Sequence, residues 1–150
     1  MNIIGIDPGV SGAVAVLTQT GRYVDVFDMP TVLANKTGNR QMVSPIDLAN
    51  MLRAQLVNAP DDVVAITEGV HAMPDQGVAS VFAFGKSYGI LLGALAALGI
   101  STHIVSPQKW KAYFSLGREK DQSRELAQRM WPDAPLGLKK HHNRAEALML

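Results

Sequence analysis

The chain has 150 residues, 47% of them hydrophobic and 18% charged, with a formal net charge of +1. This composition excludes a disordered or collagen-like chain and predicts a single globular domain over residues 1–150. The absence of cysteine excludes disulfides and thiolate metal sites, so any metal must be held by oxygen or imidazole ligands.

Three short apolar runs predict strands at the start of the chain, over residues 2–6, 13–17 and 23–27, joined by turns at Pro8-Gly9 and at residues 18–21. Met1-Asn2 leads directly into the first strand, without the basic region and longer apolar stretch of a signal peptide. We therefore expect a cytoplasmic protein with no membrane association.

Residues 31–42 have no periodicity and contain basic groups, which predicts a mobile loop. A helix over residues 44–57 is predicted by the N-cap Ser44, and the β-branched run 63–67 predicts a central strand that ends at Glu68. Residues 78–98 are apolar on most faces and rich in small side chains, which predicts a buried helix.

The C-terminal third predicts a strand over residues 102–105 and helices over 108–113 and 119–131. A last helix is expected from His141 or Asn143 to Leu150. In the 119–131 helix the side chains expected to face inward are Leu126, Ala127, Met130 and Trp131. The order of elements predicts an α/β fold, a sheet with helices on both faces.

Charge is unevenly distributed along the chain. Residues 1–100 hold five Lys and Arg against eight Asp and Glu, whereas residues 101–150 hold nine against five. A basic C-terminal third indicates a surface for a polyanion, and a solvated helix surface is the alternative explanation.

Asp7 is the first candidate functional residue, because it follows a buried apolar run and a carboxylate there needs a metal or a charge partner. The alternative is a turn residue that accepts hydrogen bonds from the amides of Gly9 and Val10. Glu68 ends the fourth strand. If that strand is adjacent and parallel to the first, both carboxylates emerge at one edge of the sheet, where open α/β sheets bind ligands.

Glu146 lies in the last helix among apolar neighbours, where an unpaired carboxylate is costly. His142 and Asn143, four and three residues earlier, share its helix face, whereas His141 faces away. With Asp7 and Glu68 they form an oxygen-rich set suited to Mg²⁺ or Mn²⁺. The alternatives are that Glu68 caps a strand and that His142 or Asn143 only starts the helix.

Five blocks stand in a distinctive order and spacing: Gly5-Ile6-Asp7-Pro8-Gly9, Glu68, Phe84-Gly85-Lys86-Ser87-Tyr88-Gly89, Pro107-Gln108-Lys109-Trp110-Lys111 and Arg144-Ala145-Glu146-Ala147-Leu148. Together they resemble the RuvC family of Holliday junction resolvases, the phage-type members most of all. The resemblance implies a ribonuclease H-like fold, with a central mixed five-stranded sheet and helices on both faces. It also implies a homodimer that cuts two opposed strands of a four-way DNA junction with divalent metal. A phage-encoded protein would work in the cytoplasm of its bacterial host.

By this resemblance Asp7 bridges two Mg²⁺ or Mn²⁺ ions, Glu68 and Glu146 complete their shells, and His142 or Asn143 takes the fourth position. The chain departs from the family here. Many members carry an acid three residues before the last carboxylate, where this chain has Asn143, and some use histidine, so His142 could serve instead after a slight shift of the helix.

Basic residues also match the family pattern. Lys111 and Lys120 correspond to lysines near the scissile phosphate, and the other candidate DNA contacts are Lys86, Lys109, Arg118 and Arg124, each with a solvated helix surface as its alternative. His71 falls where some relatives insert an aromatic residue at the junction centre, with Met73 or Phe82 as alternatives. The 78–98 helix resembles the helix that forms the dimer interface in this family. The alternative is that it belongs to the core of a single chain.

The expected function is therefore a metal-dependent crossover junction endodeoxyribonuclease that makes paired nicks as a dimer. Three alternatives stay open: a junction-binding protein without cleavage, which Asn143 would explain, a related nuclease for other branched DNA or ribosomal RNA precursors, and an ATP-handling fold of the actin and sugar-kinase type. The last also begins with Gly-Ile-Asp-x-Gly but needs a second phosphate motif and a longer chain.

Overall fold

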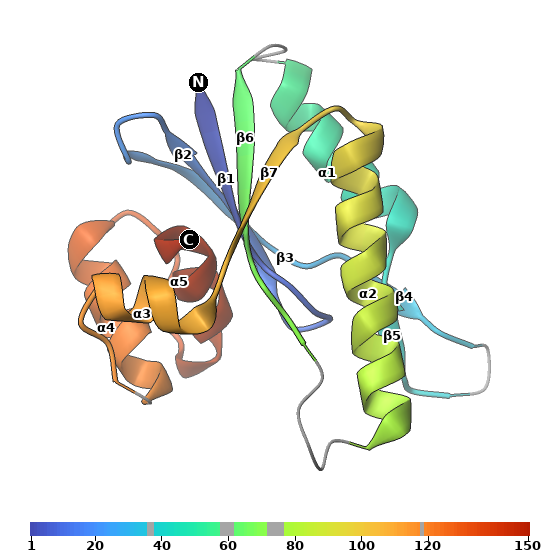
Figure 1. The fold of residues 1–150 in the computed structure, drawn as a ribbon. Coiled ribbons are helices and arrows are strands. Elements are labelled where there is room, and N and C mark those ends of the chain that lie inside the picture. Colours follow the sequence, from blue (N-terminus) through green and yellow to red (C-terminus); the bar gives the residue numbers. More distant parts are fainter. Residues whose placement is uncertain (36–37, 58–61, 72–76, 118) are drawn as a thin grey trace.

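A mixed five-stranded sheet forms the centre of the molecule (Figure 1). The computed structural model describes residues 1–35, 38–57, 62–71, 77–117 and 119–150, apart from the side chain of Lys120. β1 pairs antiparallel with β2 and parallel with β6, β2 pairs antiparallel with β3, and β6 pairs parallel with β7. The order across the sheet is β3-β2-β1-β6-β7, with bounds Tyr23–Asp28, Ala13–Thr18, Asn2–Asp7, Val63–Glu68 and Ser101–Val105.

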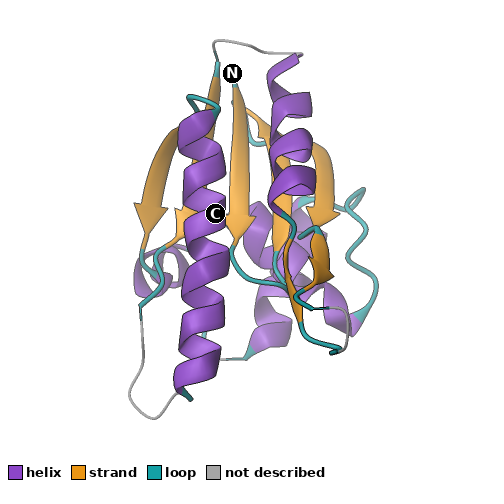
Figure 2. Cartoon of the chain, turned by 90° about the vertical axis from the view of Figure 1, so that its right-hand side faces the viewer, coloured by secondary structure: helices purple, strands orange, loops and turns teal. Residues whose placement is uncertain are grey.

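Helices cover both faces of this sheet (Figures 1 and 2). On one face α1 (Pro45–Val57) and α2 (Val78–Ala97) lie side by side. The opposite face carries α3 (Pro107–Tyr113), α4 (Lys120–Met130), the short 3₁₀ turn η1 (Lys139–His141) and α5 (His142–Met149). The predicted α/β architecture, including the parallel pairing of the first and fourth predicted strands, is confirmed.

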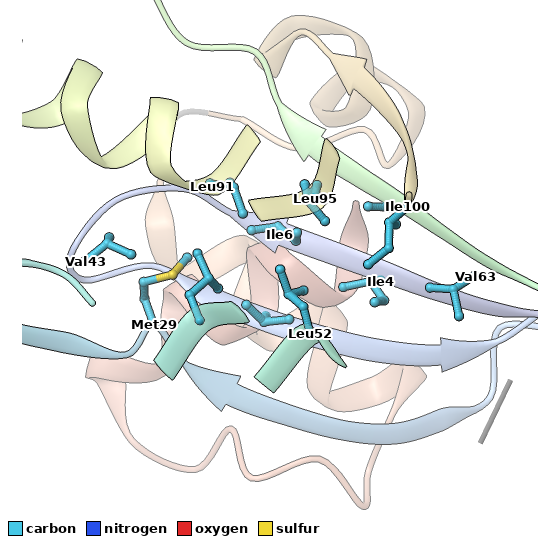
Figure 3. Packing of buried hydrophobic residues seen from close by; sticks show 12 residues of the cluster. Ile4, Ile6, Met29, Val43, Leu52, Val63, Leu91, Leu95 and Ile100 are labelled. Carbon is cyan, nitrogen blue, oxygen red and sulfur yellow. The ribbon is translucent and has the colours of Figure 1, made fainter. Parts of the chain in front are cut away.

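Side chains along β1 point alternately to the two faces of the sheet, and the hydrophobic core is divided into one cluster on each face. Ile4 and Ile6 point to the face covered by α1 and α2, where they pack with Leu52, Leu91 and Leu95 (Figure 3). Successive side chains of a strand point to opposite faces, so Gly5 and Asp7 belong to the other face. Their partners across β2 fit this assignment: Ala15 and Ala13 are buried in the second cluster, together with residues of α3, α4 and α5.

Gly5 allows α5 to approach the sheet closely. A Cβ atom at this position would lie 2.0 Å from the carbonyl oxygen of Ala147, so no larger residue fits without moving the helix. α5 packs on β1 and β2 in this way, and it brings its first turn to the β1–β2 connection beside Asp7. A small residue in the first strand thus determines where the last helix lies.

The predicted loop over residues 31–42 is wrong in part. β4 (Thr31–Leu33) and β5 (Gln41–Val43) form a separate two-stranded antiparallel hairpin. The Thr31 hydroxyl donates to Gln41 Oε1 at 2.7 Å, and the guanidinium of Arg40 donates to the carbonyl oxygen of Ala79 in α2 at 2.9 Å. These contacts between distant residues stabilise strands that are too short to show an alternating pattern.

The prediction that the 78–98 helix is buried is also wrong for this chain by itself. Only Ser87, Leu91 and Leu95 of α2 are buried, whereas Val78 is 86% and Phe82 74% exposed. α2 is long and apolar enough to cross a membrane, but the core helices of soluble proteins often meet the same criterion. In this structure the buried side chains of α2 pack on the sheet. In α4 the predicted inward residue Met130 is 45% exposed, while Ala127 and Trp131 are buried as expected.

Candidate active site

Asp7 and Glu68 lie at neighbouring ends of two parallel strands. Ile6 pairs with Thr67 in the β1–β6 ladder, so Asp7 and Glu68 are the next residues along the two strands. The Thr67 hydroxyl donates to the carbonyl oxygen of Ile6 at 3.1 Å and is fully buried, which ties the strand ends together on the α1–α2 side. Asp7 and Glu68 therefore share the opposite side, as predicted for a ligand-binding edge.

Two contacts fix the first turn of α5 against this edge. The side-chain amide of Asn143 donates to the carbonyl oxygen of Ser11 in the β1–β2 connection. Arg144 forms a bidentate pair with Asp28 at the end of β3, with Nε–Oδ1 and Nη2–Oδ2 distances of 2.6 and 2.7 Å. The hydrogen bonds from Arg144 lower the pKa of the Asp28 carboxyl below its usual value. Glu146, three residues after Asn143, shares its helix face.

Glu68 is held by a residue that was not among the predicted site residues. Trp110 of α3 is 4% exposed, and its indole N–H donates to Glu68 Oε2 at 2.8 Å. Lys111 places its ammonium 5.2 Å from the centre of the same indole ring, a cation–π arrangement. Trp110 thus connects the carboxylate at the sheet edge to a lysine predicted to act on phosphate. The only sequence signal was its position between two lysines.

The ligand types at this edge suit a hard divalent cation. Three carboxylates from β1, β6 and α5, with the amide oxygen of Asn143, are the donors that Mg²⁺ and Mn²⁺ prefer. However, in the part of the chain that the structure describes, no three His, Asp or Glu side chains lie close enough together to hold a metal ion. The residues are of the kinds that bind such a cation, and their role as metal ligands stays a prediction.

His142 and Asn143 occupy different surroundings. His142 Nδ1 lies 3.3 Å from the carbonyl oxygen of Lys139, within the turn that precedes α5. Asn143 instead contacts the β1–β2 connection that follows Asp7. The geometry therefore favours Asn143 over His142 as the residue beside Asp7, although the ligand role itself stays a prediction.

The predicted DNA contacts are spread over several elements. The side chains of His71, Lys86 and Lys109 are exposed, and that of Lys111 is half-buried. Lys120 begins α4, and Arg118 and Met73 lie outside the described residues. Arg124 is 13% exposed and donates to the carbonyl oxygen of Leu136 at 3.4 Å, a contact that holds α4 to the following segment.

Two further basic residues lie close to the site. Lys139 and Lys140 are exposed on η1, directly before α5, and neither was among the predicted DNA contacts. The Lys-Lys-His-His run in the sequence was the available signal. They precede Asn143 by four and three residues and add to the basic charge of the C-terminal third.

No protein-family model and no curated protein matches this chain. Solved structures do match it. The T. thermophilus RuvC structure in complex with a Holliday junction substrate has a TM-score of 0.66 and 17% sequence identity, and the match covers 99% of this chain and 88% of that one. A further Thermus thermophilus RuvC structure has a TM-score of 0.57 and 15% identity, covering 99% and 92% of the two chains. The protein therefore has the ribonuclease H-like fold of the RuvC structures, as its sequence motifs predict.

Proposed function

We propose that the protein is a structure-selective DNA endonuclease that hydrolyses phosphodiester bonds in four-way or other branched DNA with divalent metal. The observation that carries this proposal is the placement of Asp7 and Glu68 at adjacent parallel strand ends, with the helix that carries Glu146 packed on β1, in a RuvC-like fold. One structure with this fold is bound to a Holliday junction substrate, which supports branched DNA as the substrate class.

Asp7, Glu68 and Glu146 would hold two Mg²⁺ or Mn²⁺ ions, with Asn143 or His142 as a neutral fourth ligand. When bound, such ions supply electrostatic stabilisation for the attacking and leaving oxygens of an in-line displacement. The protein's own part is to orient the carboxylates, and Trp110 does this for Glu68 through its indole N–H.

Lysines would position the phosphate. Lys111, held beside the Trp110 ring, and Lys120, at the start of α4, would donate to oxygens of the scissile phosphate. Exposed Lys109 would contact the flanking phosphate backbone, whose negative charge supplies most of the binding free energy, and the exposed ring of His71 would stack on a base at the junction centre.

The protein would act as a homodimer that cuts two opposed strands of the junction. α2 exposes Gly85, Gly89 and Gly93 at four-residue spacing, so a second helix could pack closely along this stripe. The exposed apolar side chains of α2 support the same assignment, because a monomer rarely leaves such a face uncovered.

A junction-binding protein that does not cleave is the second candidate. The observation that favours it is the lack of three clustered metal-binding side chains among the described residues. An electrophoretic assay with a labelled four-way junction separates the two functions. Nicking in Mg²⁺ or Mn²⁺, with binding alone in EDTA, supports the nuclease, whereas binding without nicking in either metal leaves only the second candidate.

A further inference from the structure

The carboxylate that binds Arg144 lies in one row with Asp7 across the sheet. Asp28 of β3 is opposite Ala13 of β2, and Ala13 is opposite Asp7 of β1. Residues paired across strands carry their side chains on the same face, so all three belong to the face that α5 covers. Neighbouring strands lie about 4.8 Å apart, which places Asp28 roughly 10 Å from Asp7. The row therefore has an acidic residue at each end, and α5 binds one of them.

Arg144 is fully engaged within the protein. Its Nε and Nη2 atoms donate to Asp28 at 2.6 and 2.7 Å, and its Nη1 atom donates to the carbonyl oxygen of Pro135 at 3.3 Å. The Arg144 side chain is 20% exposed. A planar guanidinium that is held through all three nitrogens by two separate segments has one orientation. Arg144 thus differs from the exposed cations of the C-terminal third, because its donors are already used.

The direction of Arg144 determines the direction of Glu146. An α-helix turns by about 100° per residue, so side chains two positions apart are about 200° apart and leave nearly opposite sides of the helix. Because Arg144 reaches toward β3, Glu146 is directed toward β1 and β6, whose ends carry the other two carboxylates. The contact of Asn143 with Ser11 in the β1–β2 connection agrees with this rotation, since Asn143 and Glu146 are only about 60° apart around the helix.

We propose that the Asp28–Arg144 pair is a positioning pair for Glu146, which fixes the rotation of α5 so that Glu146 is directed toward the edge that carries Asp7. The inference deepens the proposed nuclease function and rests on it, because that function makes Glu146 a metal ligand. Arg144 then acts through the helix and binds neither the metal nor the DNA. A pair that only stabilises the fold, and an arginine that binds DNA phosphate, are the two outcomes that the test must separate.

The test measures α5 and the metal site separately in the full chain. Hydrogen exchange of the α5 amides is followed in EDTA, well below the melting temperature, and Mn²⁺ affinity is measured by calorimetry. Asp28→Asn and Arg144→Gln should each speed exchange in α5 about two- to tenfold, because the helix loses hydrogen bonds that oppose its local opening. Each should raise the Mn²⁺ dissociation constant about three- to tenfold, less than the roughly 10- to 100-fold typical for direct partners of a metal ligand.

Two further variants test whether the residues act as a unit. The double variant Asp28→Asn/Arg144→Gln should lose no more Mn²⁺ affinity than the weaker of the two single variants, because one interaction is removed in all three. Arg144→Lys keeps the charge but not the two parallel hydrogen bonds, so it should recover only part of the affinity.

The matched control is Asp62→Asn. Asp62 pairs with the amino group of Met1 at the opposite end of β1, and its side chain is 59% exposed, against 68% for Asp28. The same substitution at this position should leave both the exchange of α5 and the Mn²⁺ affinity as in the wild type.

Lower thermal stability of Asp28→Asn and Arg144→Gln, with wild-type exchange in α5 and wild-type Mn²⁺ affinity, would show that the pair only stabilises the fold and would overturn the proposal. Weaker junction binding in EDTA for Arg144→Gln but not for Asp28→Asn would assign Arg144 to DNA and would overturn it too. A wild type that binds no Mn²⁺ refutes the proposed function. The exchange measurement needs no metal, so it still decides whether the pair holds α5.

Discussion

Trp110→Phe removes the hydrogen bond to Glu68 and keeps an aromatic ring in the core. The bond is 2.8 Å long, its donor is buried, and its acceptor is a carboxylate, so its loss should cost about 1.5–3 kcal/mol. Partners that orient a metal ligand typically change metal affinity by about 10- to 100-fold when they are removed. We therefore expect the Mn²⁺ concentration for half-maximal cleavage, and the Mn²⁺ dissociation constant from calorimetry, to rise by about 10- to 100-fold.

Trp131→Phe is the matched control. The Trp131 indole donates to the carbonyl oxygen of Gly21, also at 2.8 Å, and its side chain is 7% exposed. Both variants should lose thermal stability, but only Trp110→Phe should change the response to Mn²⁺. Equal Mn²⁺ affinities in wild type and Trp110→Phe, or equal shifts in both variants, would refute the idea that this indole orients Glu68.

Three further predictions concern the edge and the helix that closes it. Asp7→Asn should abolish nicking of a four-way junction and keep junction binding in EDTA, since it removes negative charge without adding bulk; normal nicking would mean that the site lies elsewhere. Asn143→Ala should lower the single-turnover rate more than His142→Ala, because the Asn143 amide contacts the Ser11 carbonyl beside Asp7, and the reverse order would assign the fourth position to His142. Arg144 lowers the pKa of Asp28 in the folded state, so this pair stabilises the protein above the ordinary pKa of 3.8 and less as pH falls through the folded value. Asp28→Asn should therefore lower thermal stability at pH 7 and lower it progressively less as the pH falls below 3.8, and an equal loss at every pH would contradict this sign.

Helices and strands could be predicted from the sequence where the residues of a single segment show the periodicity or composition of that element. The runs that became β1 and β6 are dense in β-branched residues, and their parallel pairing follows from the α/β order of elements. β4 and β5 were missed because each has three residues and depends on its partner and on the contact of Arg40 with α2. The burial of α2 was overestimated because composition does not show which face of an apolar helix meets the sheet.

The site was predictable to a similar extent. Adjacent ends for Asp7 and Glu68 follow from strand pairing, which a sequence pattern can indicate. The bond from Trp110 to Glu68 joins residues 42 positions apart, and no local pattern specifies it. The choice between Asn143 and His142 depends on the residue at which α5 begins. The boundaries of a helix are harder to predict from sequence than its central turns.

Anomalous diffraction from a crystal grown in Mn²⁺ tests the central claim most directly. The account predicts one or two manganese peaks bounded by carboxylate oxygens of Asp7, Glu68 and Glu146, within about 2.0–2.6 Å of each ligand atom. Peaks at another surface, or no peak at this edge in a crystal saturated with Mn²⁺, would contradict a metal-dependent nuclease site at the ends of β1 and β6.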